Sequence, residues 1–157
     1  MRAQLLASQV APGAVVEVAG RPRRVLGTLR LTSAGRNWSE HCVEGERAGT
    51  REWVAIRPRG RDTVIEWTTR HDLVAEPDLE GLTLDGRDWV LDEATTATYA
   101  AAGNTGTGPV GSCDFVEYTC GESDVLVFES WDGAMWELST GTRVDPAAVQ
   151  AYHDLPG

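Results

Sequence analysis

Two glutamates, Glu40 and Glu117, stand out as groups that could carry chemistry, because each lies two positions after an aromatic residue in a segment that alternates like a β-strand. Residues at i and i+2 of a strand share one face, so each carboxylate would lie beside Trp38 or Phe115 on the inward face. A carboxylate buried beside a ring without a partner has a raised pKa, as a general acid requires. With an arginine partner it is a structural ion pair instead.

The residues leave three interpretations of these carboxylates open. Arg24, Arg51 and Arg57 lie in neighbouring predicted strands, so a structural ion pair is the favoured interpretation. The other two are contact with a cation or ligand, and acid–base catalysis by a hydrolase or isomerase of unknown substrate. Catalysis would require a cleft that holds both glutamates.

Aromatic residues widen the set of candidate ligand contacts, because the chain contains six Trp. Most of them must fill the core, but ring faces next to carboxylates could also hold an organic cation such as a polyamine. A closed aromatic pocket would indicate that small molecule, whereas an exposed apolar patch with an acidic rim would indicate a protein partner. The predicted ligand-binding residues are Trp38, Glu40, Glu117, Tyr118, Glu129 and Trp131.

Metal and nucleophile chemistry find little support in the sequence. Four residues could offer zinc ligands: His41, Cys42, Cys113 and Cys120. They form no Cys-x-x-Cys pair, and adjacent residues on a strand, such as His41 and Cys42, point to opposite faces. Cys42 could pair with His71 or His153 as a nucleophile, yet no flanking signature supports this pairing. We therefore expect no metal, no cofactor and no catalytic residue.

The charged residues divide unevenly between the two halves of the chain. The net charge is −10, and the sequence contains no Lys, which removes P-loop and Schiff-base mechanisms. Residues 1–70 hold 12 Arg and 7 acids, whereas residues 71–157 hold 2 Arg and 17 acids. The two halves should attract each other, and the second half should repel nucleic acid and attract a basic protein or a cationic ligand.

Cysteine content and hydropathy bear on the compartment. Three cysteines are few and odd in number, as is typical of reduced thiols rather than of a disulfide scaffold. The first sixteen residues hold no apolar run long enough for a signal peptide, and no segment approaches the roughly 20 apolar residues of a membrane span. We expect a soluble, cytoplasmic protein without direct membrane insertion.

Short alternating segments predict an all-β fold in a single compact domain, residues 1–157. Asp85-Gly86, between the apolar segments LTL and DWVL, is a strong two-residue hairpin signal. Residues 113–141 predict three strands in a meander. One helical turn is expected near the Ala run before Gly103, and Asp145 with Pro146 predicts a short C-terminal helix to about Tyr152.

A weak internal sequence repeat suggests two related antiparallel β units that form a barrel or a sandwich. An offset of 77 residues places Trp38 on Phe115, Glu40 on Glu117 and Glu52 on Glu129. The pseudo-repeat halves would cover about residues 13–75 and 82–150.

The stretches NWSEH, EWVAI, GPVGSCDFVEY, FESWDG and WELSTGTRV resemble the bacterial domain-of-unknown-function family numbered 4178, over about Gly13 to Val149. His41 stands where that family usually has Tyr. The resemblance implies a β-rich fold without an established catalytic activity. Its members often lie in gene neighbourhoods with a polyamine aminopropyltransferase and small membrane proteins, or with relatives of phage shock protein A. This context implies an accessory role in envelope stress or polyamine physiology.

The charge distribution and the absence of catalytic signatures favour a non-enzymatic binding or adaptor module. Its acidic half would bind a basic protein partner or a polyamine-like cation. A carboxylate-dependent hydrolase or isomerase is the alternative.

Overall fold

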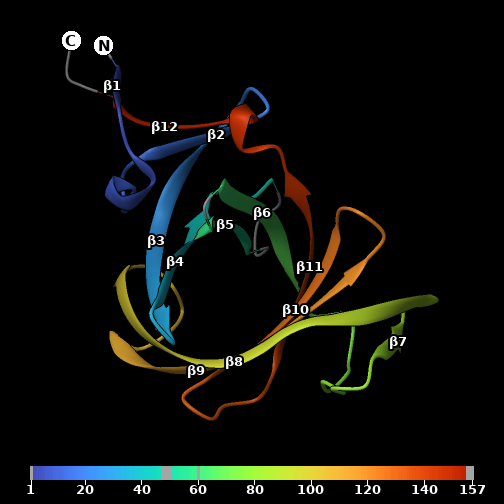
Figure 1. Cartoon of the computed structure of the whole chain (residues 1–157). Coiled ribbons are helices and arrows are strands. Elements are labelled where there is room, and N and C mark those ends of the chain that lie inside the picture. The colour runs from blue at the N-terminus through green and yellow to red at the C-terminus, as the bar shows by residue number, and fades with distance from the viewer. Residues whose placement is uncertain (1, 47–50, 60, 155–157) are drawn as a thin grey trace.

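A computed structural model describes residues 2–46, 51–59 and 61–154 and shows a closed antiparallel β-barrel (Figure 1). Its strands follow the order β3-β4-β5-β6-β11-β10-β9-β8, and β8 pairs with β3 to close the ring. The all-β prediction is confirmed. The barrel strands are β3 (Arg21–Ser33), β4 (Arg36–Val43), β5 (Glu52–Arg59), β6 (Arg61–Arg70), β8 (Arg87–Gly103), β9 (Val110–Cys120), β10 (Asp124–Trp131) and β11 (Glu137–Val144).

Short elements extend the sheet at both edges. The C-terminal strand β12 (Val149–Asp154) lies between β1 (Arg2–Gln4) and β2 (Val15–Val18), which leads into β3. At the other edge β7 (Leu82–Leu84) pairs with the start of β8. The helical segments are two 3-10 turns, η1 (Ala7–Gln9) and η2 (Pro146–Ala148), and no helix in the described ranges has the length and apolar character needed to cross a membrane.

The barrel interior is filled by side chains from both halves of the chain. Alternate residues of each strand point inward, and an eight-stranded barrel is just wide enough for them to fill. Gly141 of β11 stands opposite Trp67 of β6, where a Cβ atom would lie 1.9 Å from the Glu66 carbonyl oxygen. The buried apolar members are Leu29, Leu31, Trp38, Cys42, Trp53, Ala55, Ile65, Trp67, Ala97, Tyr99, Cys113, Phe115, Val125 and Val127.

Two smaller apolar clusters lie on the outside of the barrel wall. One packs β2 and the chain before it onto the outward side chains of β4, β5 and β6, including Val54 and Ile56. The other packs residues 73–84 onto the outward side chains of β9 and β10, including Tyr118 and Phe128. The outer wall is therefore covered in two places by segments that do not belong to the barrel.

Two local predictions about the backbone are wrong and one is confirmed. The Ala run before Gly103 is not helical, because it pairs with β3 on one side and β9 on the other. The expected C-terminal helix is a single 3-10 turn capped by Asp145, after which Val149 to Tyr152 pair with β2. The Asp85-Gly86 hairpin is present, and both residues have positive φ, 54° and 73°, as a type I′ turn requires.

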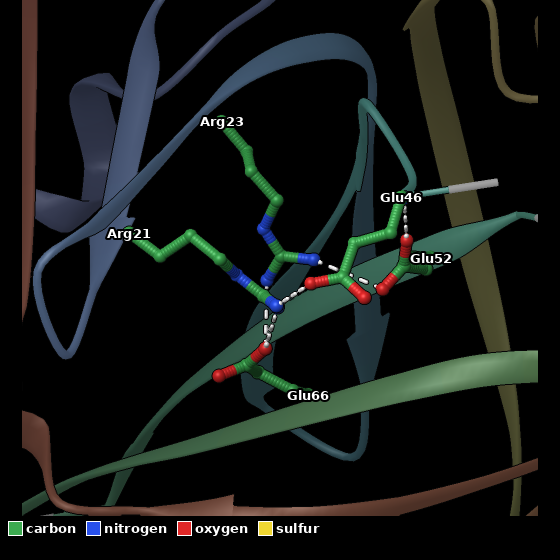
Figure 2. Close-up of polar contacts among 5 residues, drawn as sticks. All are labelled: Arg21, Arg23, Glu46, Glu52 and Glu66. Atoms are coloured by element: carbon green, nitrogen blue, oxygen red, sulfur yellow. Dashed lines mark hydrogen bonds and ion pairs between the residues drawn. The ribbon is translucent and has the colours of Figure 1, made fainter.

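Ion pairs outside the barrel join two arginines of the first half to glutamates of the same half (Figure 2). Arg23 of β3 is 7% exposed and donates to Glu52 Oε1 at 3.2 Å and to Glu66 Oε2 at 2.7 Å. Arg21 pairs with Glu46 and lies 3.6 Å from Glu66 Oε2. These contacts fix the β2–β3 hairpin to β5 and β6.

Candidate functional site

The barrel interior holds two buried carboxyl groups that share a hydrogen bond, Glu40 of β4 and Glu129 of β10. Glu40 is 0% and Glu129 6% exposed. Trp38 Nε1 donates to Glu40 Oε2 at 3.0 Å. Burial raises the pKa of both carboxyl groups, and their mutual hydrogen bond lowers the pKa of Glu40 while it raises that of Glu129 further. Of the two, Glu129 has the pKa that is raised further, so it is the carboxyl group that holds a proton to the higher pH.

Glu117, the second carboxylate singled out in the sequence, forms a buried ion pair with Arg57 of β5. The Arg57 Nη1 atom lies 2.8 Å from Oε1 and 2.9 Å from Oε2 of Glu117. The guanidinium carbon also lies 5.1 Å from the centre of the Phe115 ring. Burial raises the pKa of Glu117 and the Arg57 charge opposes that rise. The structural ion pair predicted for this glutamate is present, with Arg57 as the partner.

Strand register explains why the two interior contacts differ. Glu40 stands opposite Ala55 in the β4–β5 pair, and Glu117 stands opposite Val127 in the β9–β10 pair. Two residues further along, the first half has Arg57 and the second has Glu129. Equivalent positions therefore hold opposite charges, and each contacts a glutamate of the other half.

The strand register also shows that the 77-residue offset of the internal sequence repeat does not hold for every strand. The offset of 77 residues holds for Glu40 and Glu117, but it is 72 residues between Ala55 of β5 and Val127 of β10. Glu52 is consequently not the counterpart of Glu129, because it faces outward and contacts Arg23. That the halves arose by duplication stays a prediction.

The two remaining predicted site residues differ in position: Tyr118 lies outside the barrel wall, whereas Trp131 packs against the interior cluster. Tyr118 points to the outer face of β9, where its hydroxyl donates to the Asp78 carbonyl at 2.6 Å and accepts from the Asp78 amide at 2.9 Å. Trp131 is half-buried, packs edge-on against Tyr99 at 5.2 Å and hydrogen-bonds Glu137. Of the six predicted residues, the interior holds Trp38, Glu40, Glu117 and Glu129, with Trp131 packed against its apolar cluster, and Tyr118 lies outside.

Removing the Tyr118 hydroxyl should loosen the segment that covers β9. In Tyr118→Phe the Asp78 amide loses its acceptor, so we expect its hydrogen exchange to accelerate and the free energy of unfolding to fall by about 1 kcal/mol. Tyr99→Phe is the matched control, because its hydroxyl bonds Asp132 at 2.6 Å instead. Equal exchange of the Asp78 amide in the two variants would show that the hydroxyl does not hold this segment.

A chain of side-chain hydrogen bonds on the outer face of β4 was not predicted from the sequence. His41 Nε2 lies 3.0 Å from Ser39 Oγ, and His41 Nδ1 lies 2.9 Å from Thr28 Oγ1. Burial, followed by the charge of Arg30, lowers the pKa of His41 to about 3. The imidazole is therefore a weak base, and the positive charge nearby disfavours the imidazolium that a serine nucleophile needs. The signal in the sequence was the shared strand face of Ser39 and His41.

The two buried cysteines, Cys42 and Cys113, carry no reactive signature. Cys42, Cys113 and Cys120 are free, and burial raises the pKa of the Cys42 and Cys113 thiols. Among the described residues, no group of three or more His, Cys, Asp or Glu side chains is arranged to hold a metal ion. The sequence interpretation of the thiols as small apolar residues matches the burial of Cys42 and Cys113, whereas Cys120 is half-buried and lies 3.2 Å from Arg87 Nη2.

Two hollows on the outer surface are far larger than the cavity beside the Arg57–Glu117 ion pair. Next to Arg57 and Phe115 there is a cavity of only about 10 Å³. By contrast, a hollow of about 350 Å³ lies between residues 69–76 and 135–138; we call it the acidic groove. A second, of about 430 Å³, lies between η1 and the outer face of β3, β4 and β5; we call it the η1 pocket.

The fold and these features define a closed antiparallel barrel with buried ionic contacts in its interior and its open surface hollows on the outside. The chain belongs to the family described as Domain of unknown function (DUF4178), which matches residues 11–146. Comparison with curated proteins and with solved structures found no match for this chain.

Proposed function

We propose that this protein is a non-enzymatic binding module whose acidic groove holds a basic, partly apolar segment of a partner protein. The observation that carries this proposal is the exposure of two large apolar side chains at the groove, Val74 at 94% and Met135 at 90%. Apolar residues this exposed at a groove are typical of protein-interaction sites. The half-buried Trp136 ring also lines the groove.

The charges at the groove support a basic partner. Glu76 and Glu137 line it, and Arg70, the cation there, is offset by Asp72, which accepts two hydrogen bonds at 2.7 and 2.6 Å from its guanidinium. The Arg70 hydrogen bonds lower the pKa of Asp72 to about 2, so this carboxylate stays ionised at neutral pH. A Lys or Arg side chain of the partner would find the exposed Glu76 carboxylate beside an apolar floor, next to Glu137, which already accepts a hydrogen bond from Trp131.

Two other interpretations have weaker support. A polyamine would favour a closed aromatic pocket, whereas this groove is open and a single Trp lines it. A carboxylate-dependent hydrolase would need Glu40 or Glu117 at a cleft, and these side chains are 0% and 1% exposed. Cytoplasmic location and a link to envelope stress or polyamine physiology stay part of this proposal, the latter resting on the family resemblance.

Peptide binding tests the groove. The probe is a fluorescent peptide of alternating Arg and Leu, followed by anisotropy, with a Glu–Leu peptide and spermidine as comparisons. We expect the basic peptide alone to bind, with an affinity that falls as salt rises. Val74→Ser and Glu76→Gln should each weaken binding about tenfold, because each removes one half of the recognition.

The matched controls lie outside the groove. Val90 of β8 is 66% exposed, and Glu122 is exposed in the β9–β10 turn, so Val90→Ser and Glu122→Gln should leave peptide affinity unchanged. Equal losses in all four variants, or binding of spermidine without the peptide, would refute the proposed protein partner.

A further inference from the structure

The η1 pocket has the size and composition of a small-molecule site. Its volume of about 430 Å³ falls within the range of roughly 300–1,000 Å³ that is usual for such sites. Ile56 and Pro58 of β5 and Ala7 of η1 contribute apolar surface to its lining. The pocket lies on the arginine-rich half of the chain, and it shares no lining residue with the acidic groove.

Polar side chains that can donate hydrogen bonds line this pocket from the two adjacent strands β3 and β4. Arg30 of β3 stands directly opposite Ser39 of β4, and Thr32 stands opposite Asn37, so these side chains share the outward face. Thr32 Oγ1 donates to Asn37 Oδ1 at 2.8 Å. Because the amide oxygen of Asn37 is engaged, its NH₂ group is the part left to donate to a ligand.

Arg30 is a cation without an acidic partner. Its Nη2 atom donates to the Val10 carbonyl at 2.6 Å, which fixes the guanidinium beside the pocket. Within the described part of the chain, no carboxylate lies within ion-pair distance of Arg30, whereas Arg21, Arg23 and Arg57 each pair with a glutamate. The positive charge of Arg30 is thus available to an anion.

The hydrogen bonds of His41 can orient the Ser39 hydroxyl so that it donates into the η1 pocket. When the Thr28 hydroxyl donates to His41 Nδ1, the tautomer of a neutral imidazole places its proton on Nε2. That N–H donates to Ser39 Oγ, which leaves the Ser39 hydroxyl free to donate into the pocket. An acceptor in the pocket would favour this direction of the hydrogen bonds.

We propose that the η1 pocket binds a small amphipathic carboxylate. Its carboxylate oxygens accept hydrogen bonds from the Arg30 guanidinium, the Ser39 hydroxyl and the Asn37 amide. Its apolar part lies against Ile56 and Pro58. A charged guanidinium with neutral donors beside it matches a carboxylate head, and the apolar lining selects a hydrocarbon tail over a fully polar anion.

Calorimetric titration with octanoate tests this site on the whole chain. We expect octanoate to bind with a Kd of about 1 mM or tighter, and 1-octanol and octylamine to bind at least about tenfold more weakly, because they lack the anionic head. Arg30→Gln should weaken octanoate binding about tenfold. Ser39→Ala should weaken it less, because it removes a neutral donor.

Arg24→Gln is the matched control, because Arg24 lies on the same strand and donates to a backbone carbonyl, Gly13 O at 3.2 Å, without lining the pocket. Arg30 is exposed, so Arg30→Gln should fold like the unaltered protein, and thermal unfolding of every variant checks this. No octanoate binding, equal affinity for octanoate and octanol, or equal affinity in Arg30→Gln and Arg24→Gln would each overturn the proposal.

Discussion

Replacing Arg57 by Met is expected to lower the free energy of unfolding by about 3–5 kcal/mol. The Glu117 side chain is 1% exposed and Arg57 is its ion-pair partner, so the substitution leaves a carboxylate in the barrel interior without compensating charge. Denaturant unfolding followed by tryptophan fluorescence measures the effect. Most of the loss should be recovered in Arg57→Met with Glu117→Leu, because that pair of changes removes both charges.

Arg36→Met supplies the comparison for this prediction. Arg36 also pairs with a glutamate, Glu93, but its side chain is 40% exposed, and water screens such a pair. We expect a loss of less than about 1 kcal/mol there. If Arg57→Met costs no more than Arg36→Met, the interior ion pair is not holding the barrel together.

Changing Glu129 to Gln should weaken the pH dependence of stability that the unaltered protein shows at mildly acidic to neutral pH, to which the raised pKa values of Glu40, Glu117 and Glu137 also contribute. Burial raises the pKa of Glu129 well above its ordinary value of 4.5. Below pH 4.5 the Glu129 carboxyl group is protonated in both the folded and the unfolded state. As the pH rises above 4.5, Glu129 loses its proton first in the unfolded state. The free energy of unfolding therefore falls by roughly 1 kcal/mol per pH unit until Glu129 ionises in the folded state too.

A glutamine at position 129 can keep the hydrogen bond to Glu40, but it has no carboxyl group to titrate. Its amide can donate to the Glu40 carboxylate as the protonated Glu129 does, so Glu129→Gln should be more stable than the unaltered protein at pH 8. Arg57 and Glu137 also act on this pair electrostatically, and neither is altered. Glu122→Gln, at an exposed site, should keep the original pH profile. A Glu129→Gln protein with that same profile would show that Glu129 is already ionised in the folded state.

Much of the fold was predictable because its signals are local. The alternation in residues 113–141 and the Asp85-Gly86 turn depend on neighbours in the sequence, and both were predicted correctly. The C-terminal helix failed because Val149 to Tyr152 gain a place beside β2 that only the closed tertiary structure offers. Helix capping by Asp145 did occur, but it stabilised one turn rather than a helix.

The interior site was predictable only in part. The aromatic-x-Glu pattern placed Glu40 and Glu117 inside the barrel, since strand alternation fixes the face. It could not select Arg57 among three candidate arginines, and it gave Glu129 the wrong counterpart, because strand register is set by turn lengths and packing across the whole sheet. The outer hollows depend on how residues 7–10 and 71–76 pack on the barrel, which no local pattern specifies.

Both interior contacts join strands from different halves: Arg57 to Glu117, and Glu40 to Glu129. Each half can form its four-stranded meander from neighbouring segments, whereas closure of the barrel must bring β3 to β8 across a long stretch of chain. Pairings so distant in sequence are slow to form. We therefore expect the carboxyl groups to lose their water late in folding, when the two meanders meet. Refolding should accordingly proceed faster at pH 5 than at pH 8, because at pH 5 a larger fraction of Glu129 already carries the proton it keeps in the finished barrel.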